Sequence, residues 1–263
     1  MPGKYLENQD ILIQGNTIQW IGPTVERVED HTTIDGRGKL AIPGLVNAHT
    51  HSPENVLRGS TQSMPLELWL VKQFASQANF PPRLTYLITL AGAAEMLRSG
   101  TTAVLDHFWM AATLTRDGLD AAMQAYDDSG MRASVAPMIE DQDLVVEQAR
   151  RHRASLLKGH PLEDDYLSTS EQLDIVHYLI THWHHKGDDR LRCLPGPGGA
   201  QWCSRNLLQG CLDLSQRHAT GIHIHMAETR LQSIVCRKAY GHSAVQELQK
   251  LGLLNPSCTL AHC

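Results

Sequence analysis

The feature that most constrains the fold is a repeated alternation of short apolar runs with longer amphipathic segments. Six apolar runs follow residue 43, and several contain almost no polar residue. Runs of this kind are typical of strands buried on both faces, and strands that alternate with helices indicate a parallel sheet built from βα units. We expect these strands at 44–51, 101–107, 132–139, 191–194, 221–226 and 258–262.

The segments between the runs carry apolar residues at helical spacing. The clearest example follows Pro81 and Pro82, where leucine and alanine recur on one face until Ser99 and Gly100. Glycine at such a position ends helices readily. We expect helices at 84–98, 116–128, 142–158, 169–185, 206–217 and 231–250.

The first 42 residues have a different pattern. Two short alternating runs, 10–14 and 17–21, flank Gly15 and Asn16, which is a hairpin signal. A third short run, 32–35, is also expected to be a strand. The sequence therefore predicts a small β-unit at 1–42 in front of a main domain at 43–263.

Histidines stand at or next to the ends of the first, fifth and sixth predicted strands. His49 and His51 are spaced i, i+2, so they share one face of a strand. An isolated pair of this kind is more often two ordinary histidines in a turn. However, the fifth and sixth runs also end in histidine, at His225 and His262. Neutral imidazole is a good ligand for zinc and for ferrous iron, so a metal site is the stronger interpretation.

The position of these histidines also favours one architecture. Parallel α/β folds keep their chemistry at the carboxyl ends of the strands. A doubly wound sheet would offer one crevice, but no G-x-G-x-x-G motif follows the first strand. Histidines from the first, fifth and sixth strands can meet at one ion if the sheet curves into a ring. We therefore expect an α/β barrel.

Composition excludes several classes of protein. Lys and Arg number 23 against 28 Asp and Glu, a net charge of −5, which argues against a nucleic-acid surface. No stretch approaches the ~20 apolar residues of a membrane span, and the first residues do not resemble a secretory signal. The six cysteines show no C-x-x-C pairing. We expect reduced thiols and a cytoplasmic location.

Four segments together resemble the amidohydrolase superfamily, in the branch of the cytosine, guanine, adenosine and S-adenosylhomocysteine deaminases and the triazine hydrolases. They are 43–51 (PGLVNAHTH), 100–107 (GTTAVLDH), 223–229 (HIHMAET) and 261–263 (AHC). The resemblance covers essentially the whole chain. It implies a (β/α)8 TIM-type barrel with a small β-sandwich, of which this chain holds about six βα units and the N-terminal part of the sandwich.

The resemblance also implies roles for individual residues. His49, His51, His225 and His262 match the metal ligands, and Glu228 matches the carboxylate that shuttles protons. The chemistry agrees, because a catalytic ion needs few protein ligands and an open position for water. Glu228 lies three residues after His225, just past the strand end, where it could protonate a substrate nitrogen.

One metal ion is expected, with zinc the first choice and ferrous iron the second. Binuclear members of the superfamily carry a bridging carboxylated lysine on strand four, and this chain has no lysine in that strand. His223 competes with His225 for the fifth-strand ligand, since both share a face. We prefer His225, and we expect His223 to be a hydrogen-bonded core histidine.

Substrate contacts are expected from two loops. In the first, Trp69 could stack on a heteroaromatic ring and Glu67 could accept a hydrogen bond from it. An equally good interpretation is a short helix whose Leu66, Trp69 and Leu70 pack into the barrel. In the second, Gln201 and Trp202 are candidates for amide recognition and stacking.

Three further residues and one departure from the family bear on the substrate. His107 and Trp109 are weaker candidate contacts, and Asp106 is expected to be structural. Purine-type deaminases often have a histidine in a Pro-His-Ala-Pro context after strand four, whereas this chain has Gly198 and Gly199. This difference moves the expectation from nucleosides toward triazine-like heterocycles.

The leading hypothesis is a metal-dependent deaminase of an aminopyrimidine, aminopurine or aminotriazine. A dechlorinating or dealkylaminating hydrolase is the alternative within the fold, and a non-catalytic metal-binding protein that pairs its open edges with a partner, or with a second copy, is the alternative outside it. The chain ends one residue after His262, before the family's strands seven and eight and their metal-binding aspartate. We therefore expect a fragment with open edges at strands one and six, weak metal binding and little hydrolysis.

Overall fold

The structure of the protein is a computed structural model that describes residues 5–24, 30–60, 63–76, 80–110, 114–145, 147, 151 and 167–263. Its contacts divide the chain into two compact units, Met1–Pro43 and Gly44–Cys263. No helix in the described ranges is both long enough and apolar enough to cross a membrane.

The N-terminal unit contains one antiparallel hairpin. Strands β1 (Asp10–Gln14) and β2 (Thr17–Gly22) pair across the Gly15–Asn16 turn, with a bulge at Leu12 and Ile13. The predicted hairpin is confirmed. The prediction of a strand at 32–35 is wrong, because these residues have no regular secondary structure and pair with no described strand, and Ile34 is 84% exposed.

The larger unit is built on parallel strands. Strands β3 to β6 pair in chain order, β7 pairs with β5, and β8 pairs with β9. A bridge between Gly199 and His225 links the two sheets. Because all pairs are parallel, their carboxyl ends lie at one edge. The strands are β3 (Leu45–Thr50), β4 (Thr101–Phe108), β5 (Arg132–Ile139), β6 (Leu191–Cys193), β7 (Gly196–Pro197), β8 (Ile222–His225) and β9 (Cys258–Ala261).

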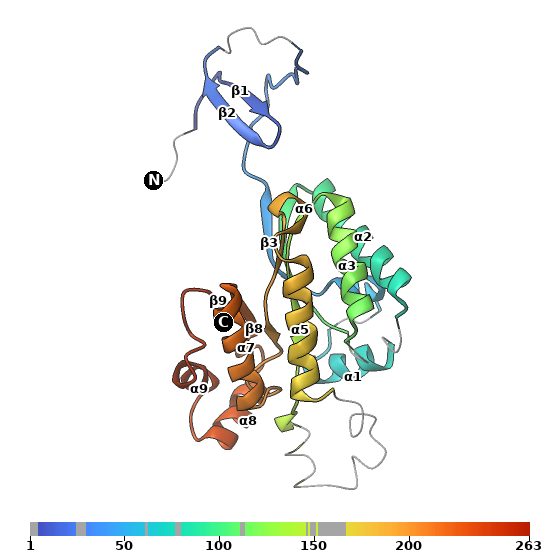
Figure 1. Ribbon diagram of the computed structural model, residues 1–263, viewed down its shortest axis with the longest axis vertical. Coiled ribbons are helices and arrows are strands. Elements are labelled where there is room, and N and C mark those ends of the chain that lie inside the picture. The colour runs from blue at the N-terminus through green and yellow to red at the C-terminus, as the bar shows by residue number, and fades with distance from the viewer. Residues whose placement is uncertain are drawn as a thin grey trace. The chain divides into compact units, whose positions relative to one another are not determined.

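Helices connect these strands and pack against the sheets (Figure 1). Between β3 and β4 lie η1, α1 and α2, and α3 connects β4 to β5. Helices α5 and α6 lie between β5 and β6, α7 between β7 and β8, and α8 and α9 between β8 and β9. Several begin at Ser or Thr caps, as their sequences require. The helices are η1 (Ser52–Leu57), α1 (Leu66–Ser76), α2 (Pro82–Arg98), α3 (Arg116–Ser129), α5 (Thr169–Trp183), α6 (Lys186–Asp189), α7 (Arg205–His218), α8 (Arg230–Tyr240) and α9 (Ala244–Lys250).

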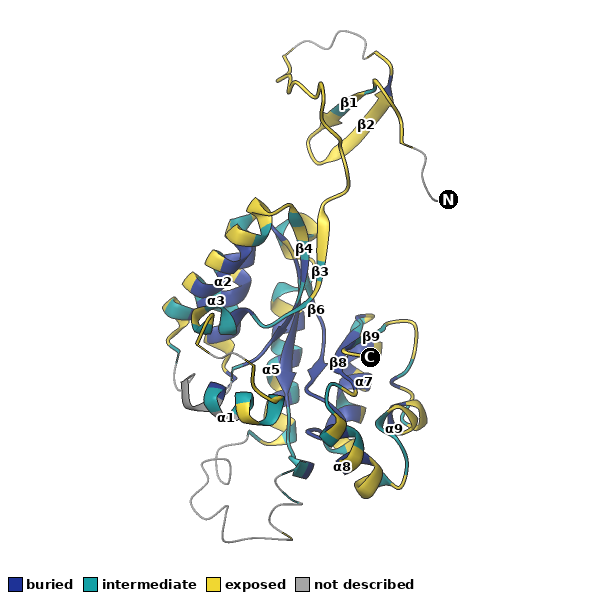
Figure 2. Cartoon of the chain, turned by 180° about the vertical axis from the view of Figure 1, so that it is seen from behind, coloured by how far each residue is buried: buried dark blue, intermediate teal, exposed yellow. Residues whose placement is uncertain are grey.

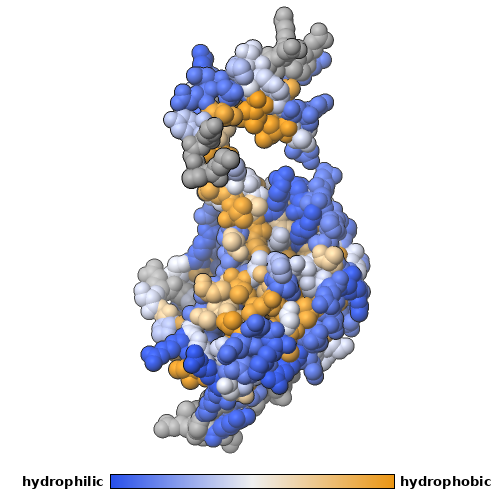
Figure 3. Space-filling view, turned by 90° about the vertical axis from the view of Figure 1, so that its left-hand side faces the viewer, coloured by the Kyte–Doolittle hydropathy of each residue, from blue (hydrophilic) through white to orange (hydrophobic). Residues whose placement is uncertain are grey.

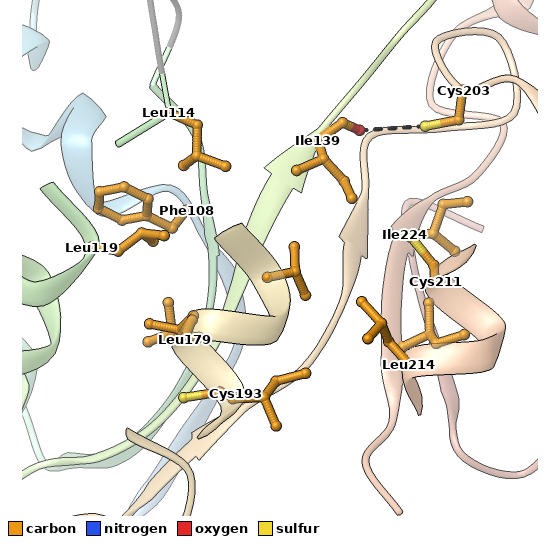
Figure 4. Close-up of a cluster of buried hydrophobic side chains, with 14 of the residues drawn as sticks. Phe108, Leu114, Leu119, Ile139, Leu179, Cys193, Cys203, Cys211, Leu214 and Ile224 are labelled. Atoms are coloured by element: carbon orange, nitrogen blue, oxygen red, sulfur yellow. Dashed lines mark hydrogen bonds between the residues drawn. The ribbon is translucent and has the colours of Figure 1, made fainter. Parts of the chain in front are cut away.

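The core lies between the strands and these helices. Phe108, Leu119 and Leu179 join β4 to α3 and α5, while Ile224 and Leu214 join β8 to α7 (Figure 4). The central strands are buried along most of their length (Figure 2). This burial on both faces explains why their sequences are apolar throughout.

The sheet does not close into a barrel. β3 and β9 each have one strand neighbour among the described residues. Leu45 and Val46 on β3 are 56% and 70% exposed, and apolar residues gather on one face of this unit (Figure 3). The fold is thus an incomplete α/β barrel of the TIM type, as predicted.

Two predicted elements differ from the structure. The helix expected at 231–250 is two helices, because Gly241 takes a left-handed φ of 75° and ends α8, and Ser243 with Gln246 forms a capping box that starts α9. Strand four, expected at 191–194, is interrupted and resumes at Gly196 as β7. Most of the helix expected at 142–158 lies outside the described residues.

Candidate metal and catalytic site

Six histidines meet at the carboxyl ends of the strands. The ring centre of His49 lies 4.8 to 6.1 Å from those of the other five. Parallel pairing places them at one edge, although up to about two hundred residues separate them in the chain. These histidines are His49 and His51 at the end of β3, His107 on β4, His223 and His225 on β8, and His262 after β9.

His51 and His225 face each other in the geometry of two ligands of one ion. The Nδ1 atom of His51 donates to the carbonyl oxygen of His107 at 2.6 Å, and Nδ1 of His225 donates to that of Gly198 at 2.8 Å. Each Nε2 atom therefore carries a lone pair, yet the two Nε2 atoms are only 3.3 Å apart. Two nitrogens at 2.0–2.1 Å from a tetrahedral zinc lie about 3.3–3.4 Å apart. His49, His51 and His225 thus fit a divalent ion.

Burial keeps these ligands neutral. Loss of water, with neighbouring histidines adding to it, lowers the pKa of His51 to about 3 and that of His49 to about 4. The same causes lower the pKa of His225 well below its usual value. Neutral imidazoles have a free lone pair, so the three rings are ready to bind metal at neutral pH.

His262 and Glu228 lie together beside this group. The His262 ring stacks parallel to that of His225, with centres 5.3 Å apart, and its Nε2 atom is 3.7 Å from Glu228 Oε1. His262 is not in the tightest donor groups formed by the described residues. Burial raises the pKa of Glu228, while the Gln232 amide donates to its carboxylate at 3.3 Å. A carboxyl with a raised pKa beside a metal site suits proton transfer.

Backbone strain is located at the same edge. Ala227, two residues after β8, has a φ of 53°, and His262, directly after β9, has a φ of 68°; neither is a glycine. Such conformations cost of order 1–3 kcal/mol and persist where the surroundings hold them. They turn the chain so that Glu228 and His262 follow the ends of β8 and β9 closely.

A second donor group lies deeper in the fold. His49, His107 and His223 bring one nitrogen each within 4.8 Å of one another. His223 is 1% exposed and hydrogen-bonded, as expected of a core histidine, but its Nε2 atom lies 2.9 Å from Nδ1 of His49. His107 was a candidate substrate contact, but it is fully buried and so lies too deep to reach the surface. Local spacing gave no signal for this group, because it depends on strand pairing.

Two acidic side chains, Asp106 and Glu54, lie near the end of β3. Asp106 accepts hydrogen bonds from the backbone N–H of Ser52 and from the hydroxyl of Tyr126, both at 2.9 Å, which agrees with a structural role. Glu54 in η1 was not anticipated from the sequence. Burial, together with Asp106 and Glu228, raises its pKa to about 8.

The candidate substrate residues fall into one aromatic group. Trp109, Met138 and Trp202 are buried against one another, with Leu66, Trp69 and Leu70 of α1 packed on them. The Trp202 ring centre lies 6.5 Å from that of His225. The helical interpretation of the α1 segment is therefore confirmed, and it places Trp69 in the aromatic group.

Two polar candidates lie close by. Glu67 accepts a hydrogen bond at 2.9 Å from Thr229, the residue after Glu228, so α1 is linked to the segment that follows β8. Gln201 is 3% exposed, and its side-chain nitrogen has no partner among the described residues.

Comparison with known proteins agrees with this geometry. The Amidohydrolase family profile matches residues 40–263. The chain is 30% identical over 262 residues to the 5-methylthioadenosine/S-adenosylhomocysteine deaminase of Caldanaerobacter subterraneus subsp. tengcongensis, covering 99% of this chain and 54% of that protein. It is 31% identical to the 5'-deoxyadenosine deaminase of Methanocaldococcus jannaschii, covering 98% and 55%.

Solved structures give the same result for the fold. The atrazine chlorohydrolase of Arthrobacter aurescens TC1, complexed with zinc, superposes with a TM-score of 0.84 at 25% identity, covering 98% of this chain and 56% of that one. The guanine deaminase of E. coli gives a TM-score of 0.75 at 21% identity, covering 96% and 55%. The chain spans about half the length of these proteins. On the match over residues 40–263, the chain belongs to the amidohydrolase family.

Proposed function

We propose that this chain carries the metal centre of a deaminase that acts on an amino-substituted N-heteroaromatic ring. The observation that carries the proposal is that the Nε2 atoms of His51 and His225 lie 3.3 Å apart. The Nδ1 atom of each ring bonds to a backbone carbonyl, and the carboxyl of Glu228 lies beside this group. In this proposal His49, His51 and His225 bind one divalent ion through Nε2, with His262 as a fourth donor. Zinc is preferred over ferrous iron because the atrazine chlorohydrolase structure, which has a similar fold, is a complex with zinc.

Each side chain has a distinct role in the reaction. A bound divalent ion would supply a water whose pKa is lowered toward ~7. His51 and His225 hold their lone pairs toward the ion through the carbonyl anchors. Glu228, kept protonated to higher pH by burial, donates its proton to a ring nitrogen of the substrate. Its carboxylate then accepts a proton from the attacking water and passes that proton to the amino group, which leaves as ammonia.

The aromatic group sets the substrate class. The Trp202 ring lies next to His225, and the rings of Trp69 and Trp109 stack on each other in the same cluster. Flat aromatic faces favour a flat heteroaromatic ring. Glu67 and Gln201 offer an acceptor and an amide for its polar edge. The relatives named as deaminases of adenosine derivatives make 6-aminopurines the first candidates, and aminotriazines the second.

The test is ammonia release by the 263-residue chain loaded with zinc or ferrous iron. Substrates are 5'-deoxyadenosine, 5-methylthioadenosine, cytosine, guanine and an aminotriazine. The tight donor groups among the described residues contain histidine alone, so we expect turnover well below the ~1–10³ s⁻¹ of typical enzymes. Glu228→Gln should reduce the rate by a factor of about 10²–10⁴ without changing metal affinity. Metal binding with no ammonia from any amine would contradict the proposal.

A chlorotriazine in the same panel tests the alternative reaction. Gly198 and Gly199 stand where purine-type deaminases often carry a histidine, which favours a smaller ring. Chloride release that exceeds ammonia release would assign the chain to dehalogenation. In that case Glu228→Gln should affect the rate less, since chloride needs no proton to leave.

A further inference from the structure

The hydrogen bonds behind His49 form a chain whose direction can be assigned. The Thr259 hydroxyl lies 3.2 Å from the carbonyl oxygen of Ile222 and 2.8 Å from Nδ1 of His223. We assign the single hydroxyl proton to the Ile222 carbonyl, because a carbonyl oxygen can only accept and this assignment satisfies both contacts of the hydroxyl. The Thr259 oxygen is then left to accept, and the proton of His223 must be on Nδ1.

The same reasoning extends to His49. With its proton on Nδ1, His223 presents a lone pair at Nε2, which lies 2.9 Å from Nδ1 of His49. A hydrogen bond between two imidazole nitrogens needs the proton on one of them and the lone pair on the other. His49 must therefore donate from Nδ1, and its lone pair is on Nε2. His51 and His225 have the same tautomer through their carbonyl anchors.

We propose that His223, anchored by Thr259, is a positioning residue that fixes the proton of His49 on Nδ1 and presents its Nε2 atom to the metal. The inference rests on the metal centre proposed above. It gives each of the three ligands a hydrogen-bonded Nδ1 atom: two bond to backbone carbonyls and one bonds to a second imidazole. Such partners fix the tautomer and orientation of a ligand.

The deeper donor group of His49, His107 and His223, here called the inner group, supports the ligand His49 through hydrogen bonds and is not a second metal site. The 2.9 Å between His49 Nδ1 and His223 Nε2 is a hydrogen-bond distance and is shorter than the about 3.3–3.4 Å between two ligands of one zinc. His107 donates from Nε2 to the Gly196 carbonyl at 3.0 Å, so its buried Nδ1 atom is an acceptor without a hydrogen-bond partner among the described residues. An ion there would have to displace the proton that His49 shares with His223.

The test removes the anchoring hydroxyl and keeps the histidines. Thr259→Val and Thr259→Ser are compared with wild type, with Thr102→Val as the matched control, since Thr102 is an exposed β4 threonine at the opposite end of its strand from His107. Zinc affinity is measured by competition with a chromophoric chelator. Histidine tautomers in the zinc-free protein are read from ¹⁵N chemical shifts, with thermal melting to show that each variant folds.

We expect Thr259→Val to weaken zinc binding about 10–100-fold, as loss of a ligand's hydrogen-bond partner does elsewhere. Thr259→Ser and Thr102→Val should stay within about threefold of wild type. His49 should be protonated at Nδ1 in wild type and lose that preference in Thr259→Val.

The outcomes separate the two proposals. If wild type binds zinc no better than His51→Ala, the metal centre itself is refuted. If wild type binds and Thr259→Val binds equally well, or if His49 is protonated at Nε2, only the positioning role is refuted. Two zinc ions per chain, one of them lost in His223→Phe, would also overturn it and assign the inner group to a metal.

Discussion

At the scale of single residues, the three proposed metal ligands each give a role to both imidazole nitrogens. A neutral histidine has one donor and one acceptor, and which nitrogen carries the proton is set by its partner. The carbonyl of Gly198 sets it for His225, and the carbonyl of His107 sets it for His51. The backbone of neighbouring strands therefore prepares the site before any ion binds.

Glu140, at the end of β5, gives a test of buried charge away from the histidines. Burial, with Asp143 adding to it, raises the pKa of Glu140 to about 8 from its ordinary 4.5. The folded state thus keeps a proton that the unfolded state releases, and the unfolding free energy falls as pH rises from about 4.5 to 8. Glu140→Gln should remove this loss, so the variant should gain about 2–4 kcal/mol relative to wild type between pH 5 and pH 9.

Urea unfolding at the two pH values measures this gain. Glu95→Gln, which changes an exposed glutamate of α2 that pairs with Arg58, is the control and should stay within about 1 kcal/mol of wild type, by the same amount at both pH values. Equal responses of the two variants would show that Glu140 is ionised in the folded protein.

Spacing within one strand predicts some of these residues and not others. His49 and His51 are two apart, so a shared face follows from strand geometry alone, and the H-x-x-E spacing of His225 and Glu228 is equally local. The pairing of His223 with Thr259 depends on the register of β8 against β9, thirty-six residues apart. No local pattern encodes that register, which is why Thr259 was not singled out.

At the scale of elements, two helix ends form a matched pair. The residue after α3 is Gly130 with a φ of 73°, and the residue after α7 is Ala219 with a φ of 52°. A left-handed conformation costs an L-residue about 1–2 kcal/mol, whereas glycine adopts it freely but loses more chain entropy. Ala219→Gly should therefore raise the unfolding free energy by about 0.5–1 kcal/mol, and Gly130→Ala should lower it by about 1 kcal/mol.

Denaturant melts of the two variants check the sign. Apart from its chain neighbours, no residue in the described ranges lies within 4 Å of a Cβ atom added at Gly130, so a loss of stability there reports conformation and not a clash. If both changes shift stability in the same direction, helix propensity and not the left-handed cap controls these ends.

Element boundaries were predicted where caps are strong. Ser99 and Gly100 end α2 as expected, and β5 covers 132–139 as expected. The single helix expected at 231–250 failed because its apolar spacing continues across Gly241, while the cap signals of Gly241 and Ser243 were given no weight. The helix ends where the capping residues are, although the apolar spacing continues, because capping residues provide hydrogen bonds for the backbone groups at a helix end.

At the scale of the whole larger unit, two sheets are joined by few backbone links. Residues 195–199 connect them through the Gly199–His225 bridge and through the His223 N–H, which donates to the carbonyl of Pro195 at 3.1 Å. The proposed metal ligands lie on both sheets, His49 and His51 with β3 and His225 with β8. A bound ion would therefore act as a crosslink between elements that the hydrogen-bond ladder connects only weakly.

Zinc should consequently stabilise the fold as well as complete the site. An ion that binds only the folded state adds about 2.7 kcal/mol at a free concentration one hundred times its dissociation constant. For a unit of this size that is a rise of about 5–10 °C in Tm. Scanning calorimetry with and without zinc measures it, and the rise should be absent in His225→Ala and retained in His177→Ala, which changes a half-buried histidine of α5 that pairs with His218. A rise that persists in His225→Ala would place the stabilising zinc elsewhere on the protein.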